Sequence, residues 1–233
     1  VDGVYISQHK VSCITPPHPR TGFVSLSIAF EKDMWSSGQS KFLYYDQPKV
    51  SKIEPACGPE SGYTEITVYG KNFINLGLGH VNWVFNRTIN MNATVMDHNT
   101  IKCDSPPAFG WYKTELKRPM FYYLEITLDG NLYGGPAQKF SYYKEPELTA
   151  ISPTLGPIEG GTHVSISGAG FAQPAVCNMT VRFGNIYTRP IEYNGYEIHV
   201  ESPPVDISDA VVVAVGLNGQ QFTKDKTLHF RDE

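Results

Sequence analysis

Short runs of β-branched and aromatic residues recur along this chain, and turn-forming residues bound each run. The clearest runs are residues 66–69, 122–128, 164–167 and 211–215. Asp129-Gly130 and Asn218-Gly219 follow two of these runs and can adopt the positive φ angles that tight hairpins need. Apolar residues at helical spacing are hard to find. The pattern therefore predicts an all-β protein of antiparallel β-sandwiches, with no helices between the strands.

The chain also contains internal copies of one pattern. Residues 41–59, KFLYYDQPKVSKIEPACGP, return 98 positions later as residues 139–157, KFSYYKEPELTAISPTLGP. A second segment that ends in Pro-Pro occurs three times, at residues 10–17, 100–107 and 197–204. A fixed period of this kind is typical of an array of one small domain.

The back half of the repeated pattern occurs three times and its front half only twice, which predicts an incomplete first domain. We expect residues 1–48 to be the C-terminal part of a domain whose front half is absent. Residues 49–145 and 146–233 should each be a complete domain, because a period near 100 residues fits small domains. Linkers of two or three residues between the strands predict that the domains are arranged as a fairly rigid rod.

Composition limits the possible partners. The chain has 233 residues, of which 41% are hydrophobic and 18% are charged, and its net charge is -4. These totals indicate no basic face, so we expect no nucleic acid as a partner. The longest apolar run, residues 210–215, is far shorter than the roughly 20 residues that span a bilayer, so we expect no membrane insertion within this segment. The first residues lack Met and a signal-peptide pattern, which predicts a processed or excerpted sequence.

The repeated motif xxPxxGPxxGGTxVxIxGxxF, followed by IxCxSPP and an FxYY strand, resembles the immunoglobulin-like IPT/TIG domain. The resemblance covers the whole chain and implies tandem IPT/TIG β-sandwiches. The family occurs in plexin and Met-type receptor ectodomains, in surface and adhesion proteins, and in Rel-type and Olf-type transcription factors. The resemblance therefore implies a fold and leaves the function open.

Four cysteines are present, and two of them change together between the copies. Cys57 and Cys103 lie in one repeat, and the next repeat has Leu155 and Val200 at the matching positions. This joint loss predicts a disulfide between Cys57 and Cys103 and an oxidising compartment, although two free core thiols are the alternative. The remaining two, Cys13 and Cys177, are either buried thiols or bonded to groups outside the fragment.

Three N-glycosylation sequons end in Thr, at Asn86, Asn92 and Asn178, and they predict N-linked glycans on the surface of a secreted or cell-surface protein. Paired prolines follow each back-half strand, where they are better explained as residues that end sheet pairing than as hydroxyproline-linked sugar sites. These prolines are Pro16, Pro17, Pro106, Pro107, Pro203 and Pro204.

No catalytic motif is present, and no cysteine and histidine cluster has metal-ligand spacing. We therefore expect no enzyme activity, no cofactor and no metal. In an alternating strand, one tyrosine of each neighbouring pair should face outward, so Tyr44 or Tyr45, and Tyr142 or Tyr143, should lie at the domain junctions.

The incomplete first domain should carry an apolar face that its own strands cannot cover. The expected members of this face are Val11, Phe23, Val24, Leu26, Ile28, Phe30 and Phe42. Either a longer parent chain or strands donated by a neighbouring copy could cover it. A head-to-tail contact between copies does not close on itself and would generate a filament.

These expectations favour a glycosylated extracellular structural protein whose copies assemble head-to-tail into a filament or surface fibre. The alternative is the stalk of a plexin-like or Met-like receptor or adhesion protein that positions a ligand-binding head. A DNA-binding module is disfavoured by the acidic balance, the sequons and the predicted disulfide.

Overall fold

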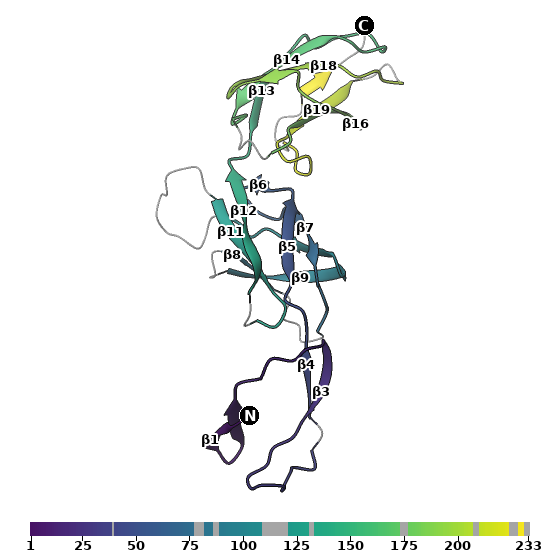
Figure 1. Cartoon of the computed structure of the whole chain (residues 1–233). Helices are drawn as coiled ribbons and strands as arrows, with labels where there is room; N and C mark the ends of the chain where they lie inside the picture. Colours follow the sequence, from purple (N-terminus) through teal and green to yellow (C-terminus); the bar gives the residue numbers. More distant parts are fainter. Residues whose placement is uncertain are drawn as a thin grey trace. The chain divides into compact units, whose positions relative to one another are not determined.

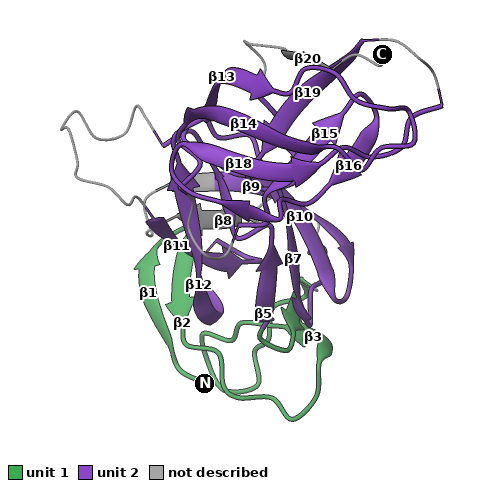
Figure 2. Cartoon of the chain, turned by 90° about the horizontal axis from the view of Figure 1, so that it is seen from above, with its two compact units in different colours: residues 1–47 green, residues 48–233 purple. Residues whose placement is uncertain are grey.

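The structure is a computed structural model in which the chain forms strands joined by loops (Figure 1). It describes residues 1–38, 40–76, 82–85, 89–108, 121–130, 133–172, 177–206, 210–223 and 228–230. Within these residues every regular element is a β-strand, which confirms the predicted all-β class. The chain divides into two compact units, residues 1–47 (unit 1) and 48–233 (unit 2), coloured green and purple in Figure 2.

Unit 1 consists of two antiparallel strand pairs. The first pair is β1 (Gly3–Ser7) with β2 (Lys10–Cys13), and the second is β3 (Gly22–Leu26) with β4 (Ser40–Tyr44). The Tyr44 hydroxyl donates a hydrogen bond to the Pro16 carbonyl at 2.8 Å, and this bond ties the second pair to the segment before it.

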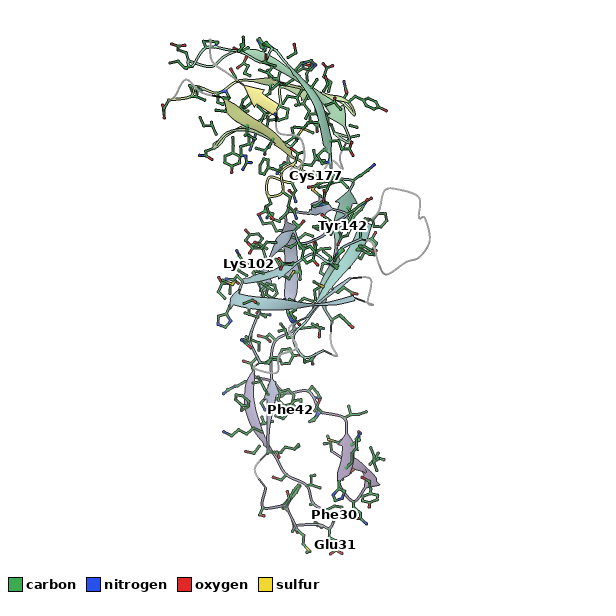
Figure 3. The ribbon with its side chains drawn as sticks, turned by 180° about the vertical axis from the view of Figure 1, so that it is seen from behind. Phe30, Glu31, Phe42, Lys102, Tyr142 and Cys177 are labelled. Atoms are coloured by element: carbon green, nitrogen blue, oxygen red, sulfur yellow. A yellow bond between two sulfur atoms is a disulfide. The ribbon has the colours of Figure 1, made fainter. Side chains whose placement is uncertain are left out.

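Most large apolar side chains of unit 1 are exposed. Phe23 is 69% exposed and Phe30, labelled in Figure 3, is 81% exposed. Of the other members of the expected apolar face, Leu26, Ile28 and Phe42 are exposed, whereas Val11 and Val24 are half-buried. Two-stranded sheets of this kind are marginal without a covering layer.

The first sandwich of unit 2 has two layers joined by one long strand, β9 (Ile89–Asp97). The strand order of the first layer is β5-β7-β10-β9, and that of the second is β9-β8-β11-β12-β6. The first part of β9 pairs with β8, and its last part pairs with β10. The remaining strands are β5 (Lys49–Glu54), β6 (Cys57–Pro59), β7 (Glu65–Lys71), β8 (Asn82–Phe85), β10 (Thr100–Asp104), β11 (Phe121–Thr127) and β12 (Tyr133–Tyr143).

The second sandwich repeats this arrangement with separate sheets, β13-β14-β18-β17 and β16-β15-β19-β20. Strands β16 (Ile186–Thr188) and β17 (Glu192–Tyr193) take the places of the two parts of β9. Pro190 lies between them, and proline has no N–H to donate to a ladder, so pairing stops there. The other strands are β13 (Glu147–Ser152), β14 (His163–Ala169), β15 (Thr180–Phe183), β18 (Glu197–Glu201), β19 (Val211–Gly216) and β20 (Leu228–Phe230).

One strand pairing differs from the prediction of antiparallel sheets throughout. The short strand β6 pairs in parallel with the end of β12, so that Cys57 lies opposite Ser141 and Pro59 lies opposite Tyr143. The prediction was wrong here because the chain changes layer between β5 and β6 without reversing its direction. It reaches the layer formed by β12 rather than the one formed by β5.

Matching glycines in β7 and β14 explain part of the repeated motif. A side chain on Gly70 would lie 2.1 Å from the Lys49 carbonyl oxygen and 2.4 Å from the ring of Phe73. Gly168 has the same neighbours in the second sandwich, the Glu147 carbonyl and the Phe171 ring. Both rings are buried, so each glycine makes room for a phenylalanine that fills the core beside the neighbouring strand.

The tyrosine pair at the end of β12 differs from the expectation that one member faces outward. Tyr142 and Tyr143 are both buried. Tyr142 packs edge-on against Phe140 and Tyr122 within the first sandwich. Tyr143 instead joins the buried cluster of the second sandwich, beside Leu148. The outward position predicted by alternation is therefore covered by the next domain.

These buried tyrosines predict a loss of stability in alkaline solution. Burial raises the pKa of both Tyr142 and Tyr143 well above the ordinary tyrosine value. Above about pH 10 the unfolded chain therefore releases protons that the folded chain retains. The free energy of unfolding should fall by about 1.4 kcal/mol per pH unit for each tyrosine above pH 10, and the buried Cys103 thiol, whose pKa is also raised, should add a similar decline that begins near pH 9. Urea unfolding measured between pH 7 and about pH 11.5 checks this slope.

A matched pair of variants isolates the effect. Tyr142→Phe should make the alkaline decline shallower, because it removes one of the buried groups whose pKa is raised. Tyr196→Phe changes an exposed tyrosine and should leave the slope as it is. Equal slopes in the two variants would contradict the assignment to Tyr142.

Candidate functional site

The two sandwiches of unit 2 are joined by a disulfide bond between Cys57 of β6 and Cys177, which is labelled in Figure 3. Their Cα atoms are 5.8 Å apart, although the residues are separated by 120 positions in the sequence. The predicted disulfide between Cys57 and Cys103 is therefore wrong. Cys103 lies in the middle of the first layer, in β10, whereas Cys57 lies at the end of the second layer that meets the next domain.

The two free thiols have different surroundings. Cys103 is buried, and burial, followed by the nearby Asp104 carboxylate, raises the pKa of its thiol above the ordinary value. A protonated buried thiol of this kind is a packing group rather than a nucleophile. Cys13, in unit 1, is exposed, so the alternative of a buried thiol is wrong there. Both alternatives are wrong for Cys177, because its partner, Cys57, lies within the chain.

Amide side chains from the turn after β19 form the polar part of the junction. The Gln221 side chain accepts a hydrogen bond from Thr64 Oγ1 at 2.8 Å and donates one to the Gly62 carbonyl at 3.0 Å. The Asn218 side chain donates to the carbonyl of Cys57 at 3.4 Å and to Gln221 Oε1 at 2.7 Å. This turn therefore satisfies backbone and side-chain groups of the first sandwich directly.

The segment that links the sandwiches adds further contacts. The Glu60 backbone N–H donates to the Tyr143 carbonyl at 2.9 Å, and the Ser61 hydroxyl donates to the Glu145 carboxylate at 2.5 Å. Tyr143 and Cys57 belong to the same buried cluster as the core of the second sandwich. The covalent bond, the hydrogen bonds and the shared apolar cluster together fix the orientation of one sandwich against the other.

A cavity of about 800 Å³ lies beside these contacts. It is lined by residues of both sandwiches: Pro59, Ser61, Gly62, Tyr63, Tyr143, Lys144, Glu145, Pro146, Glu147, Leu148, Gln221, Phe222 and Thr223. Tyr63 stands at its rim with a φ angle of 57°, where the second sandwich has Gly161 with a φ angle of 81°. A left-handed conformation is unfavourable for a tyrosine, by roughly 1–2 kcal/mol.

The sequence had no signal for the Gln221 contacts, since Asn218-Gly219 indicated a hairpin turn and no more. We expect Gln221→Ala to lower the free energy of unfolding of unit 2 by about 1–2 kcal/mol, because Thr64 and the Gly62 carbonyl lose their partner. Chemical denaturation followed by tryptophan fluorescence measures the change. Gln138→Ala, at a half-buried position of β12 whose side chain donates to the nearby Pro136 carbonyl, is the control and should change stability by less than about 0.5 kcal/mol. Equal effects of the two changes would show that the junction does not depend on Gln221.

The predicted glycosylation sites lie in different surroundings. The side chains of Asn92 and Asn178 are exposed, whereas Asn86 lies outside the described residues. Asn178 directly follows the disulfide-bonded Cys177. Of the paired prolines, Pro106 is buried and its carbonyl accepts the Tyr142 hydroxyl at 2.6 Å, which fits a structural role. Pro107 and Pro203 are half-buried, and Pro16, Pro17 and Pro204 are exposed.

The described part of the chain has no cluster of three or more His, Cys, Asp or Glu side chains placed to hold a metal ion. Nor does any described segment form a helix that is long and apolar enough to cross a membrane. The histidines that contact carboxylates do so on the surface, where His199 Nε2 lies 3.6 Å from Glu197 Oε2. The candidate site is accordingly the junction between the two sandwiches of unit 2.

Comparisons with known proteins match this architecture. The sequence model of the IPT/TIG domain matches residues 48–142 and 146–230. Plexin-A2 of Mus musculus is 27% identical over 228 residues, which are 93% of this chain and 12% of that protein. Plexin-A2 of Homo sapiens is 25% identical over the same length, again 12% of that protein. Among solved structures, the plexin A4 extracellular region aligns with a TM-score of 0.49 at 18% identity, covering 80% of this chain and 16% of that one.

Proposed function

Since this chain belongs to the IPT/TIG domain family, we propose that it is part of the extracellular stalk of a plexin-like cell-surface receptor. The similarity to plexin-A2 carries this proposal, because it extends over 93% of the chain and includes residues outside the two matched IPT/TIG domains. The chain spans 12% of that relative, so the receptor's ligand and signalling partners lie outside the proposal.

The disulfide supports an extracellular location, because such bonds form and persist in oxidising compartments. The junction supports a mechanical role. A stalk must hold a distant head in a defined orientation, and the Cys57–Cys177 bond with the Gln221 contacts restrains the relation between successive domains. The filament that the predicted incomplete domain favoured has no support from the comparisons, which favour the stalk alternative.

The location is tested on intact cells that express the full natural gene. An antibody against the second sandwich should stain these cells without permeabilisation. Staining that appears only after permeabilisation would refute the extracellular stalk. An antibody against a cytoplasmic protein is the control for membrane integrity.

We also propose N-linked glycans on Asn92 and Asn178, because both side chains are exposed within sequons. Protein secreted from eukaryotic cells should lose mass on treatment with an N-glycosidase. In Asn178→Gln, the mass lost on this treatment should be smaller than in the wild type by the mass of one glycan. Asn185→Gln, an exposed asparagine outside any sequon, is the control and should remove none. If Asn178→Gln lost as much mass as the wild type, a glycan at that position would be excluded.

A further inference from the structure

One end of the second sandwich carries an uncovered apolar hollow. Leu155 is 39% exposed and Ile158 is 37% exposed, and the two lie three residues apart. They belong to a hollow of about 660 Å³. This hollow, here named the terminal hollow, is lined by Pro153, Leu155, Gly156, Pro157, Ile158, Glu159 and Thr162.

The matching surface of the first sandwich is covered. Cys57, at the position of Leu155, and Thr64, at the position of Thr162, are both 0% exposed. Glu60, at the position of Ile158, is also buried. The covering groups are Cys177 and the turn that carries Asn218 and Gln221, all of which come from the following domain.

The backbone scaffold of the two ends is the same. In the first sandwich, the N–H of Tyr63 donates to the Ser105 carbonyl at 2.8 Å, and the N–H of Ala108 donates to the Glu60 carbonyl at 2.8 Å. In the second, the N–H of Gly161 donates to the Ser202 carbonyl at 2.9 Å, and the N–H of Val205 donates to the Ile158 carbonyl at 2.8 Å.

The first glycine of each turn also matches, since Gly62 has a φ angle of 78° and Gly160 one of 77°. Two ends with the same backbone scaffold therefore differ in whether a domain covers them. The covered end shows which part of a following domain this scaffold accepts.

We propose that the terminal hollow is a docking site for a further IPT/TIG domain of the same polypeptide, which occupies it with the turn between its last two strands. The occupied copy of this surface in unit 2 is the basis for that choice, because the same scaffold there receives the same part of the following domain. The inference rests on the domain array of the proposed stalk and extends it by one joint.

The chemistry of this joint differs from that of the first. The cysteine and the glutamate of the first surface are replaced by Leu155 and Ile158, so the joint has no thiol at this position to form a disulfide. Burying these side chains needs apolar partners, and the docking turn should therefore carry apolar residues where the turn of the second sandwich carries Asn218 and Gln221. Gly160 occupies the position of Gly62, whose carbonyl accepts a hydrogen bond from the side-chain amide of Gln221. The second joint is thus non-covalent and apolar, whereas the first is covalent and polar.

Thiol protection tests the proposal. Ile158→Cys in a Cys13→Ser background places one accessible thiol in the hollow, since Cys103 is buried. Its rate of reaction with a maleimide is measured in the 233-residue chain and in the natural protein extended beyond Glu233 by one further repeat. We expect reaction at least about tenfold slower in the extended protein, because the docking turn covers the thiol. Ile191→Cys in the same background, exposed in a loop away from the hollow, should react equally fast in both.

Equal rates for Ile158→Cys in the two proteins would overturn the proposal, as would a natural gene that encodes no IPT/TIG domain after this one. Protection that appears in the 233-residue chain as its concentration rises would identify a second copy as the occupant and would also overturn it. All rates are measured on purified protein, so failure here leaves the cell-surface staining result unaffected.

Discussion

Replacing both Cys57 and Cys177 by serine is expected to lower the free energy of unfolding of unit 2 by about 2–5 kcal/mol. The bond closes a loop between residues 120 positions apart, so its removal frees the unfolded chain much more than the folded one. The double substitution also removes the covalent link between the cores of the two sandwiches. Guanidinium unfolding under non-reducing conditions measures the difference, and the transition should broaden or split as the two sandwiches unfold more independently.

The control for this experiment is Cys13→Ser, which removes an exposed thiol and should change stability by less than about 0.5 kcal/mol. A double variant as stable as this control would show that hydrogen bonds and apolar packing suffice at the junction. Non-reducing peptide mapping of the wild-type protein checks the pairing directly. A peptide that links Cys57 to Cys103 would contradict the structure.

The second large effect is expected from Gly168→Ala, which should destabilise the second sandwich by about 3 kcal/mol. The added methyl group would lie 2.1 Å from the Glu147 carbonyl oxygen and 2.5 Å from the Phe171 ring. The ring is buried and the carbonyl belongs to the neighbouring strand, so β13 must move away from β14. Thermal unfolding of the purified protein measures the loss as a lower Tm.

Gly161→Ala separates steric crowding from backbone conformation. Gly161 has a φ angle of 81°, but no atom lies within 4 Å of the position that a methyl group would take. Only the left-handed conformation opposes this substitution, so we expect a loss of about 1 kcal/mol. If both alanine variants lost the same stability, crowding at Gly168 would not be the cause of its effect.

The comparison of sequence and structure is informative at particular residues. The alternation of β7 was predictable, with Ile66 and Val68 facing the core, because strand alternation depends on neighbouring positions only. The positive φ angles of Gly130 and Gly219 followed from the turn dipeptides in the same way. Two of the outcomes that were not predictable, the pairing of Cys57 and the burial of Tyr143, both depend on the domain that follows.

The joint replacement of Cys57 and Cys103 in the next repeat was the signal that misled the prediction. The two positions change for separate reasons. The counterpart of Cys103 is Val200, which fills the same buried place in its own sandwich. The counterpart of Cys57 is Leu155, which lies at the exposed end of the domain. Co-variation within a repeat could not separate a shared bond from two independent environments.

The family, the all-β class and the periodic arrangement of domains followed from the order of residues alone, because strand alternation, turn chemistry and the internal copies are local or repeated features of the chain. Three-dimensional packing was needed to place Cys57 against Cys177 and to bring Gln221 to Thr64. Packing also left Leu155 exposed while it covered the matching position of the first sandwich. Those contacts depend on how one folded domain meets the next, and no short stretch of sequence encodes that orientation.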